Sequence, residues 1–353
     1  MRRQVTIANV TAALLASLSL AACADSPVAP TPVVRQTATT TGLRSDKLAT
    51  IEFEGRFPAL YIQNSDGSGR FRVHFENVRD RIAGNYGPDM LPVGDRNILA
   101  LGPAKWSPDG QQLAVVVSVA FDQSEVVVMN ANGLNMRTVS PNSQWIMGDV
   151  DWAPDSRAIA YAMSTDFLGR RGDLFVTDLV KDEVRRVTVG QNLSGLTEYR
   201  WDAAGRRLWF AQFEGMTEDD MNRVSHLAYA DVGGAAPVAT DRILVGDVQG
   251  IARDGSWALV TRYPKGGSDW SMRELVRVSL AGDGGQTVLA SGDVLYAEMM
   301  DGDREAMLAV NDASDPYAGR HYYRVVGLGA PDDVRVKLDV DPFASSIAVL
   351  RAR

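Results

Sequence analysis

The sequence holds only one cysteine, Cys23, and three histidines among its 353 residues. A single cysteine excludes an intrachain disulfide. The histidines, His74, His226 and His321, lie too far apart for the ligand spacing of common zinc sites. The chain also lacks a Gly-x-Ser-x-Gly nucleophile elbow and a phosphate-cradling glycine loop. We therefore expect no catalytic motif, no metal and no cofactor, and the sequence favours a protein that is not an enzyme without deciding the question.

Positive charge and long apolar runs are also scarce. The chain has 36 Lys and Arg against 44 Asp and Glu, a formal net charge of −8. This balance argues against nucleic acid or another polyanion as a partner. After residue 22, no stretch reaches the roughly 18 consecutive apolar residues of a transmembrane helix. We expect a globular protein that does not cross a membrane.

The N-terminus has the pattern of a signal peptide. Arg2 and Arg3 precede an apolar, small-residue run, 10–22, that is too short for a stable transmembrane helix. The run ends in Leu20-Ala-Ala-Cys23, which resembles the bacterial lipobox. That resemblance implies removal of residues 1–22 and lipidation of Cys23, whose acyl chains would anchor the protein durably. A plain secretory peptide with an incidental cysteine is the alternative.

Residues 23–47 are expected to form a flexible tether after the lipidated cysteine. Pro27, Pro30 and Pro32 precede a threonine-rich stretch, and no apolar periodicity indicates a helix. In enteric lipoproteins an aspartate directly after the cysteine favours inner-membrane retention, whereas this chain has Ala24. We therefore expect a bacterial cell-envelope location, on the outer membrane facing the periplasm.

The most specific feature of the remaining chain, 48–353, is an internal repeat. Trp106-Ser-Pro-Asp-Gly110 returns in degenerate form, and the copies begin 46, 49, 50 and 48 residues apart, at Trp152, Trp201, Ile251 and Met299. A period of this length indicates one supersecondary unit stacked repeatedly. Each copy precedes short β-branched or apolar runs such as 113–119 and 125–130, which end in turn residues and predict strands. Evenly spaced short strands without helical segments predict a β-propeller of four-stranded blades.

The motif followed by an apolar strand and an Asn-x-x-Gly turn resembles the TolB-like repeat of bacterial propellers, which is related to WD repeats. The resemblance covers nearly all of the chain after the tether and implies an all-β fold. It says little about function, because propellers host unrelated activities. TolB itself has an additional N-terminal α/β domain, and this chain has the expected anchor and tether in its place.

Chain length predicts six blades, since seven units of about 48 residues would exceed the available sequence. We expect a sixth unit to begin at 338–342 and to continue at 346–350, close to the end of the sequence. The segments 59–64 and 71–75 then supply its last two strands, so that both ends of the chain share one blade and close the ring. The assignment of 50–53 is ambiguous.

The repeat also locates candidate ligand-binding residues. Positions one and three before each motif are expected on the innermost strand, where alternate side chains face the central channel. Over six units this rule gives twelve positions, Lys337 among them, and eight of the twelve are our channel-lining candidates: Lys105, Asp149, Asp151, Glu198, Arg200, Tyr296, Glu298 and Asp339. They would bind a polar ligand or an ion. The alternative, which we favour, is a solvated channel held by reciprocal ion pairs.

Three further features are weaker candidates. The turn aspartates Asp109, Asp155 and Asp254 are more consistent with backbone hydrogen bonds than with metal ligation, and the motif tryptophans with packing between blades. An insertion, 74–102, is long enough to serve as a partner-binding lid. The acidic loop at 218–220 would either bind calcium through its carboxylates or, as is more common for such loops, only be exposed to solvent.

Two functions from different classes follow. The first is a lipid-anchored, non-catalytic binding or scaffolding module for a protein or glycan of the cell envelope. The second is a propeller enzyme, a lyase or hydrolase, with a polar site at the channel mouth. The membrane, through the lipid anchor, is the only partner that the sequence itself indicates.

Overall fold

The computed structural model describes the chain from Lys47 onward. The described residues are 47–54, 57–75, 98, 100–120, 123–141, 146–164, 171–188, 193–194, 196–217, 222–234, 236–264, 273–281, 284–292, 294–300, 303, 305–311, 320–326, 328, 334–338 and 346–350. They belong to one unit of the chain, Val34–Arg353. Within them every regular element is a β-strand.

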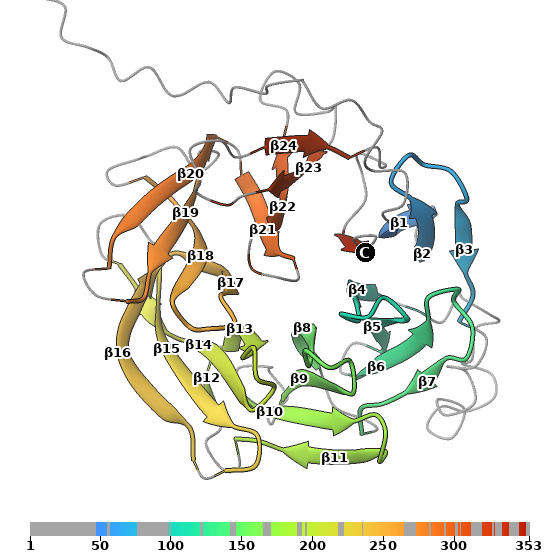
Figure 1. Ribbon diagram of the computed structural model, residues 1–353, viewed down its shortest axis with the longest axis horizontal. Coiled ribbons are helices and arrows are strands. Elements are labelled where there is room, and N and C mark those ends of the chain that lie inside the picture. Colours follow the sequence, from blue (N-terminus) through green and yellow to red (C-terminus); the bar gives the residue numbers. More distant parts are fainter. Residues whose placement is uncertain are drawn as a thin grey trace, which may run out of the picture. The chain divides into compact units, whose positions relative to one another are not determined.

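The strands form six antiparallel sheets, which we name blades A to F and which surround a common centre (Figure 1). From the innermost strand outward, blade A contains β25 (Ser346–Leu350), β1 (Lys47–Glu54), β2 (Phe57–Asn64) and β3 (Phe71–Val73). Blade B contains β4 (Ala100–Trp106), β5 (Gln112–Ala120), β6 (Gln123–Asn130) and β7 (Arg137–Thr138). Blade C contains β8 (Ile146–Trp152), β9 (Ala158–Ser164), β10 (Arg171–Asp178) and β11 (Glu183–Arg186), with the short β12 (Leu193–Ser194) also paired to β10.

The second half of the ring repeats this plan. Blade D contains β13 (Leu196–Trp201), β14 (Arg207–Met216), β15 (Arg223–Asp231) and β16 (Val238–Val245). Blade E contains β17 (Asp247–Ile251), β18 (Trp257–Arg262), β19 (Arg273–Ser279) and β20 (Gln286–Gly292). Blade F contains β21 (Val294–Met299), β22 (Glu305–Asn311), β23 (Arg320–Val326) and β24 (Val334–Lys337). The predicted six-bladed propeller is confirmed.

Blade A joins the two ends of the described chain, as predicted, but the division of strands differs from the prediction. β1 pairs with β25 from Lys47↔Leu350 to Ile51↔Ser346, so three N-terminal strands and one C-terminal strand make the blade. The prediction of two from each end was wrong because it counted a strand at 338–342. The chain just before that point, β24, instead pairs with β23 as the outermost strand of blade F. The ambiguous residues 50–53 lie in β1.

The hydrophobic core lies between neighbouring blades. In β5, Leu113, Val115 and Val117 belong to a cluster with blade A, whereas Ala114 and Val116 belong to a cluster with blade C. Both faces of the strand are therefore buried. This explains a continuous apolar run where a sheet with one solvated face would show alternation.

The repeated motif forms the turn between the first and second strands of each blade. Its fifth position adopts a left-handed backbone in every described copy, with φ of 71° at Gly110, 63° at Ser156, 65° at Gly205, 68° at Gly255 and 55° at Asp303. Glycine adopts this conformation without steric cost, and Asp is among the residues that tolerate it best. The fifth position is thus fixed by the backbone rather than by a ligand.

The motif side chains hold this turn and join adjacent blades, as expected. Asp109, Asp155 and Asp254 each accept a hydrogen bond at about 3 Å from the backbone N–H two residues later. The indole N–H of Trp152 donates to the carbonyl of Lys105 in the preceding blade at 2.9 Å. Trp201 donates in the same way to the carbonyl of Asp151 at 3.2 Å.

Candidate functional site

Lys105 lies at the centre of a charged network on the innermost strands. Its Nζ is 2.6 Å from Oε1 of Glu298 in blade F and 3.3 Å from Oδ2 of Asp149 in blade C. Lys105 itself belongs to β4 of blade B, so its ammonium joins blade B to its neighbour, blade C, and to blade F, which lies beyond blade A. Burial alone would lower the pKa of Lys105, but the carboxylates of Glu298, Asp149 and Glu198 outweigh it and raise the pKa. Lys105 therefore stays protonated.

Arg200 forms a second connection between blades that are not neighbours. Its Nη2 lies 3.0 Å from Oδ1 of Asp303 and donates to the carbonyl of Met300 at 3.1 Å. Arg200 is on β13 of blade D, whereas Asp303 follows β21 of blade F, so the pair passes blade E. Asp303 also accepts a hydrogen bond from the backbone N–H of Arg253 at 2.6 Å. Arg200 is 5% exposed, so these contacts replace the hydration of its guanidinium.

Glu198 is the carboxyl group of this network that has no close cation in the described structure. Burial raises the pKa of Glu198 to about 8, and the carboxylates of Asp149 and Asp151 add to the rise. The charges of Lys105 and Arg200 act in the opposite direction. Burial likewise raises the pKa of Glu298, against the effect of Lys105. A carboxyl group that is protonated near neutral pH can donate a hydrogen bond or a proton.

The structure brings together five of the eight channel candidates: Lys105, Asp149, Glu198, Arg200 and Glu298. Asp151 is adjacent, but its Oδ2 accepts the backbone N–H of Trp201 at 2.7 Å, which gives it a structural role between blades. Tyr296 lies on β21, paired with Ala309. Asp339 lies outside the described residues. Lys337, two residues earlier, ends β24, the outermost strand of blade F, and not an innermost strand as expected.

Asp303 is a member of the network that the sequence reasoning missed. It occupies the position where three of the five motif copies have glycine. A glycine position filled by an acidic residue was therefore the available signal. Among the described residues, no group of three or more His, Cys, Asp or Glu side chains is arranged to hold a metal ion.

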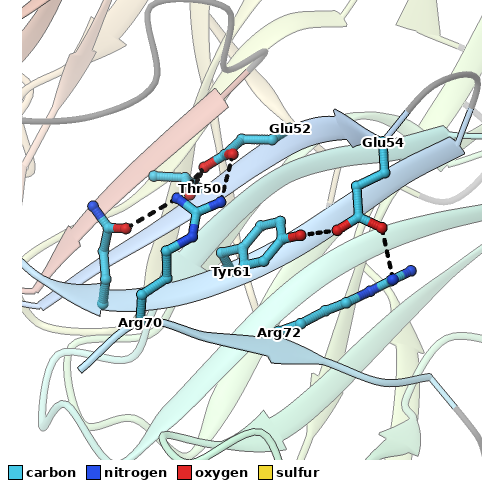
Figure 2. Close-up of polar contacts among 7 residues, drawn as sticks. Thr50, Glu52, Glu54, Tyr61, Arg70 and Arg72 are labelled. Atoms are coloured by element: carbon cyan, nitrogen blue, oxygen red, sulfur yellow. Dashed lines mark hydrogen bonds and ion pairs between the residues drawn. The ribbon is translucent and has the colours of Figure 1, made fainter. Parts of the chain in front are cut away.

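A second polar cluster lies on blade A (Figure 2). Arg70 donates to Oε2 of Glu52 at 2.7 Å and to its Oε1 at 3.0 Å, while Thr50 donates to the same Oε1 at 2.8 Å. The guanidinium of Arg70 lies 3.9 Å from the ring centroid of Tyr61. The Glu52 side chain is 8% exposed and the Arg70 side chain 37%, so the carboxylate is buried whereas the guanidinium reaches the surface.

The second half of the same cluster joins Tyr61, Glu54 and Arg72 (Figure 2). The Tyr61 hydroxyl donates to Glu54, and Arg72 binds the other oxygen of Glu54 at 2.7 Å. The Glu54 side chain is 42% exposed. The two glutamate–arginine pairs on this blade therefore differ in their carboxylates, since Glu52 is buried and Glu54 is exposed.

This cluster lies on the face of blade A that is directed toward blade F. Leu48, on the same face of β1, packs with Met307 and Tyr322 of blade F, so Thr50 and Glu52 lie on the face directed toward blade F. The corresponding strand of blade B presents three apolar residues to blade A: Leu113, Val115 and Val117. The blade that closes the ring thus carries a buried carboxylate where its neighbour carries core residues.

Several expectations fall on residues that are not described. Cys23, nearly all of the tether 23–47, most of the insertion 74–102 and the acidic loop at 218–220 lie outside the described residues. In the described part of the chain, no helix has the length and apolar character needed to span a bilayer.

Comparison with known proteins supports the fold. No protein-family model and no curated protein matches the sequence. Among solved structures, TolB from Acinetobacter baumannii is similar with a TM-score of 0.59 and 15% identity, over 87% of this chain and 67% of that one. Tricorn protease is similar with a TM-score of 0.52 and 13% identity, over 85% of this chain and 30% of that one. At such identities the likeness concerns the fold alone, and the chain has a TolB-like β-propeller fold.

Proposed function

We propose that this chain is a lipid-anchored β-propeller of the bacterial cell envelope that acts as a non-catalytic binding or scaffolding module for a protein or a glycan. The observation that carries the proposal is the mutual pairing of the channel charges. Lys105 is neutralised by Glu298 and Asp149, and Arg200 by Asp303. Ion pairs between charged side chains of different blades make the ring more rigid. A rigid ring is a suitable platform for presenting a binding surface.

Anchoring at Cys23, on the outer membrane facing the periplasm, is part of this proposal. It rests on the lipobox-like Leu20-Ala-Ala-Cys23 and the proline-rich tether. Fractionation of a Gram-negative host expressing the full chain tests it. We expect the parent protein in the outer-membrane fraction and the Cys23→Ser variant in the soluble periplasmic fraction. An unchanged distribution of the variant would refute lipid anchoring.

The binding role is tested by crosslinking in intact cells followed by purification of the full chain. The matched control carries residues 1–47 fused to an unrelated globular domain, which keeps the anchor and tether but lacks the propeller. A partner enriched with the full chain and absent from the control supports the proposal. A partner captured equally by both would assign binding to the tether, and the absence of any enriched partner would leave only scaffolding.

One observation favours the alternative, a hydrolase or lyase. Glu198, on the innermost strand of blade D, has a pKa raised to about 8 and so has the protonation behaviour of a general acid. Glycans, lactones and peptides form the substrate panel. Turnover that falls by at least about a hundredfold in Glu198→Gln, the size expected for loss of a general acid, would replace the binding proposal by the enzymatic one.

A further inference from the structure

The point at which the described chain begins identifies one face of the ring. Lys47, the first residue of β1, pairs with Asn64, the last residue of β2, and with Leu350, the last residue of β25. The turn 65–70 between β2 and β3 therefore lies at the same end of blade A as Lys47. Because antiparallel strands alternate in direction, the motif turn of a blade and the turn between its third and fourth strands lie at one end. We name the surface that carries these turns the entry face.

The entry face is continuous from blade to blade. In the motif turns, the backbone N–H of Asp109 in blade B donates to Oγ of Ser156 in blade C at 3.1 Å. Beside the outer turns, Arg137 of blade B donates to the carbonyl of Leu179 in blade C at 2.9 Å. The turns of neighbouring blades therefore form one surface.

The two most exposed large apolar side chains of the described structure lie on the entry face. Leu134 is 62% exposed in the turn between β6 and β7, and Val180 is 72% exposed in the turn between β10 and β11. Phe71, the first residue of β3, and Val184, the second residue of β11, are also exposed. These four residues, which we name the apolar arc, belong to the consecutive blades A, B and C (Figure 1).

The charges beside the apolar arc balance one another. The segments 107–111, 131–137, 153–157 and 178–186 of blades B and C hold five cations and five anions: Arg137, Arg157, Lys181, Arg185 and Arg186 against Asp109, Asp155, Asp178, Asp182 and Glu183. Attraction between net charges therefore does not select the partner of this surface. The exposed apolar side chains do.

The form of the apolar arc favours a lipid bilayer as its partner. Its residues are separate side chains at or beside turns of three blades, whereas a protein partner covers one patch with close shape complementarity. The fluid interface of a bilayer accepts separate apolar side chains without such complementarity.

The place of the arc favours the same partner. The chain between Cys23 and Lys47 reaches at most about 80 Å when fully extended. A propeller anchored at Cys23 is thus held near the bilayer at an effective concentration of about 1 mM. A contact too weak to bind a free protein to vesicles is populated under this condition.

We propose that the entry face contacts the membrane surface and inserts the apolar arc among the lipid headgroups. This inference rests on the proposed anchoring of the chain at Cys23. It gives the propeller a fixed orientation, in which the opposite face, with the turns between the second and third strands, is presented to partners in the periplasm.

The test labels one face at a time. Cys23 is the only cysteine, so Cys23→Ser provides a cysteine-free background. The chain 23–353 with this change and an N-terminal hexahistidine tag is held on phosphatidylethanolamine–phosphatidylglycerol vesicles that contain a nickel-chelating lipid. A fluorophore is attached to Leu134→Cys or Val180→Cys. The matched controls are Phe53→Cys and Met216→Cys, since both residues are exposed at the opposite ends of second strands.

Brominated lipids should quench the fluorophore at least about threefold more strongly at positions 134 and 180 than at 53 and 216. A tenfold rise in ionic strength should leave this difference unchanged, because it screens only contacts between charges. Leu134→Glu should weaken the quenching at position 180 at least about twofold, with circular dichroism as a check of folding. Equal quenching on both faces, stronger quenching at 53 and 216, or a difference that salt abolishes overturns the proposal.

The nickel-chelating lipid replaces the acyl chains, so this result does not depend on lipidation of Cys23. Fractionation of the Cys23→Ser variant tests the anchor separately. A quenching difference together with unchanged fractionation would refute the anchor and leave the face preference standing. Normal anchoring together with equal quenching would refute the face preference alone.

Discussion

Arg200 and Asp303 form a 3.0 Å ion pair although their blades, D and F, are separated by blade E. Lys105 and Glu298 do the same for blades B and F, on either side of blade A. Blade F, the last complete blade of the chain, is therefore connected to two distant blades through the centre of the ring. These contacts supplement the packing between neighbours and make the channel network a structural element.

Removing the carboxylate of Asp303 should destabilise the protein by about 3 kcal/mol, because it leaves the buried charge of Arg200 uncompensated. Asp303→Asn and Asp303→Gly both suit the left-handed backbone there, so neither adds strain. Asp254→Asn in the exposed turn of blade E is the control and should cost less than about 1 kcal/mol. Urea unfolding measures all three. Equal losses for Asp303→Asn and Asp254→Asn would contradict a role of the ion pair.

Glu198 should make stability depend on pH between about 4.5 and 8. In this window the folded protein holds a proton that the unfolded chain releases, because the folded pKa is raised from 4.5 to about 8. Stability therefore falls as pH rises through the window, and the loss is complete above pH of about 8. Glu198→Gln lacks this loss, so its Tm relative to the parent should rise with pH and then level off.

The comparison of Glu198→Gln with the parent cancels the contribution of Glu298, which both proteins retain. Glu183→Gln on the exposed strand β11 serves as the control. Thermal unfolding in steps from pH 5 to 9 gives the two difference curves. Parallel curves for Glu198→Gln and the parent would show that the Glu198 carboxyl is not desolvated.

The two ion pairs of blade A should differ in energy although they lie on one sheet. Glu52→Ala removes two hydrogen bonds from Arg70, whose side chain is 37% exposed and can then be solvated, and it should cost about 1 to 2 kcal/mol. Glu54→Ala removes an exposed pair and should cost less than about 1 kcal/mol. The triple change Thr50→Val, Glu52→Leu and Arg70→Met should be tolerated, because apolar side chains can replace a pair whose carboxylate is buried. Chemical denaturation measures the free energy of unfolding of each variant. A triple variant that is less stable than Glu52→Ala would contradict this reasoning.

Two glycines with the same φ of 68° separate backbone strain from steric conflict. At Gly284 an added Cβ meets no described atom within 4 Å, so Gly284→Ala should cost only the left-handed conformation, about 1 kcal/mol. At Gly255 the Cβ would lie 2.4 Å from the Trp209 ring. Gly255→Ala should therefore cost at least about 2 kcal/mol more, because the packing of blades D and E must shift. Equal Tm values for the two variants would show that Trp209 moves freely.

Much of the fold followed from the sequence because a propeller is built from local units. The period of the motif, the β-branched runs and the glycine at the turn describe one blade, and their repetition predicts the ring. The turn aspartates and Trp152 and Trp201 also took their expected structural roles. The first strand of blades B to F was correctly located by counting back from the motif, which is why Lys105, Asp149, Glu198, Arg200 and Glu298 were selected together.

The tertiary structure decided what depends on contacts between distant segments. The pairing of β1 with β25 could not be read from either end of the chain, since the register of a strand depends on the partner that it meets. The same holds for Asp303, which looks like an ordinary turn residue until Arg200 approaches it from another blade. Sequence periodicity determined the blades themselves, whereas only the closed ring determined which charges meet across its centre, because that pairing is set by distance in space and not by spacing along the chain.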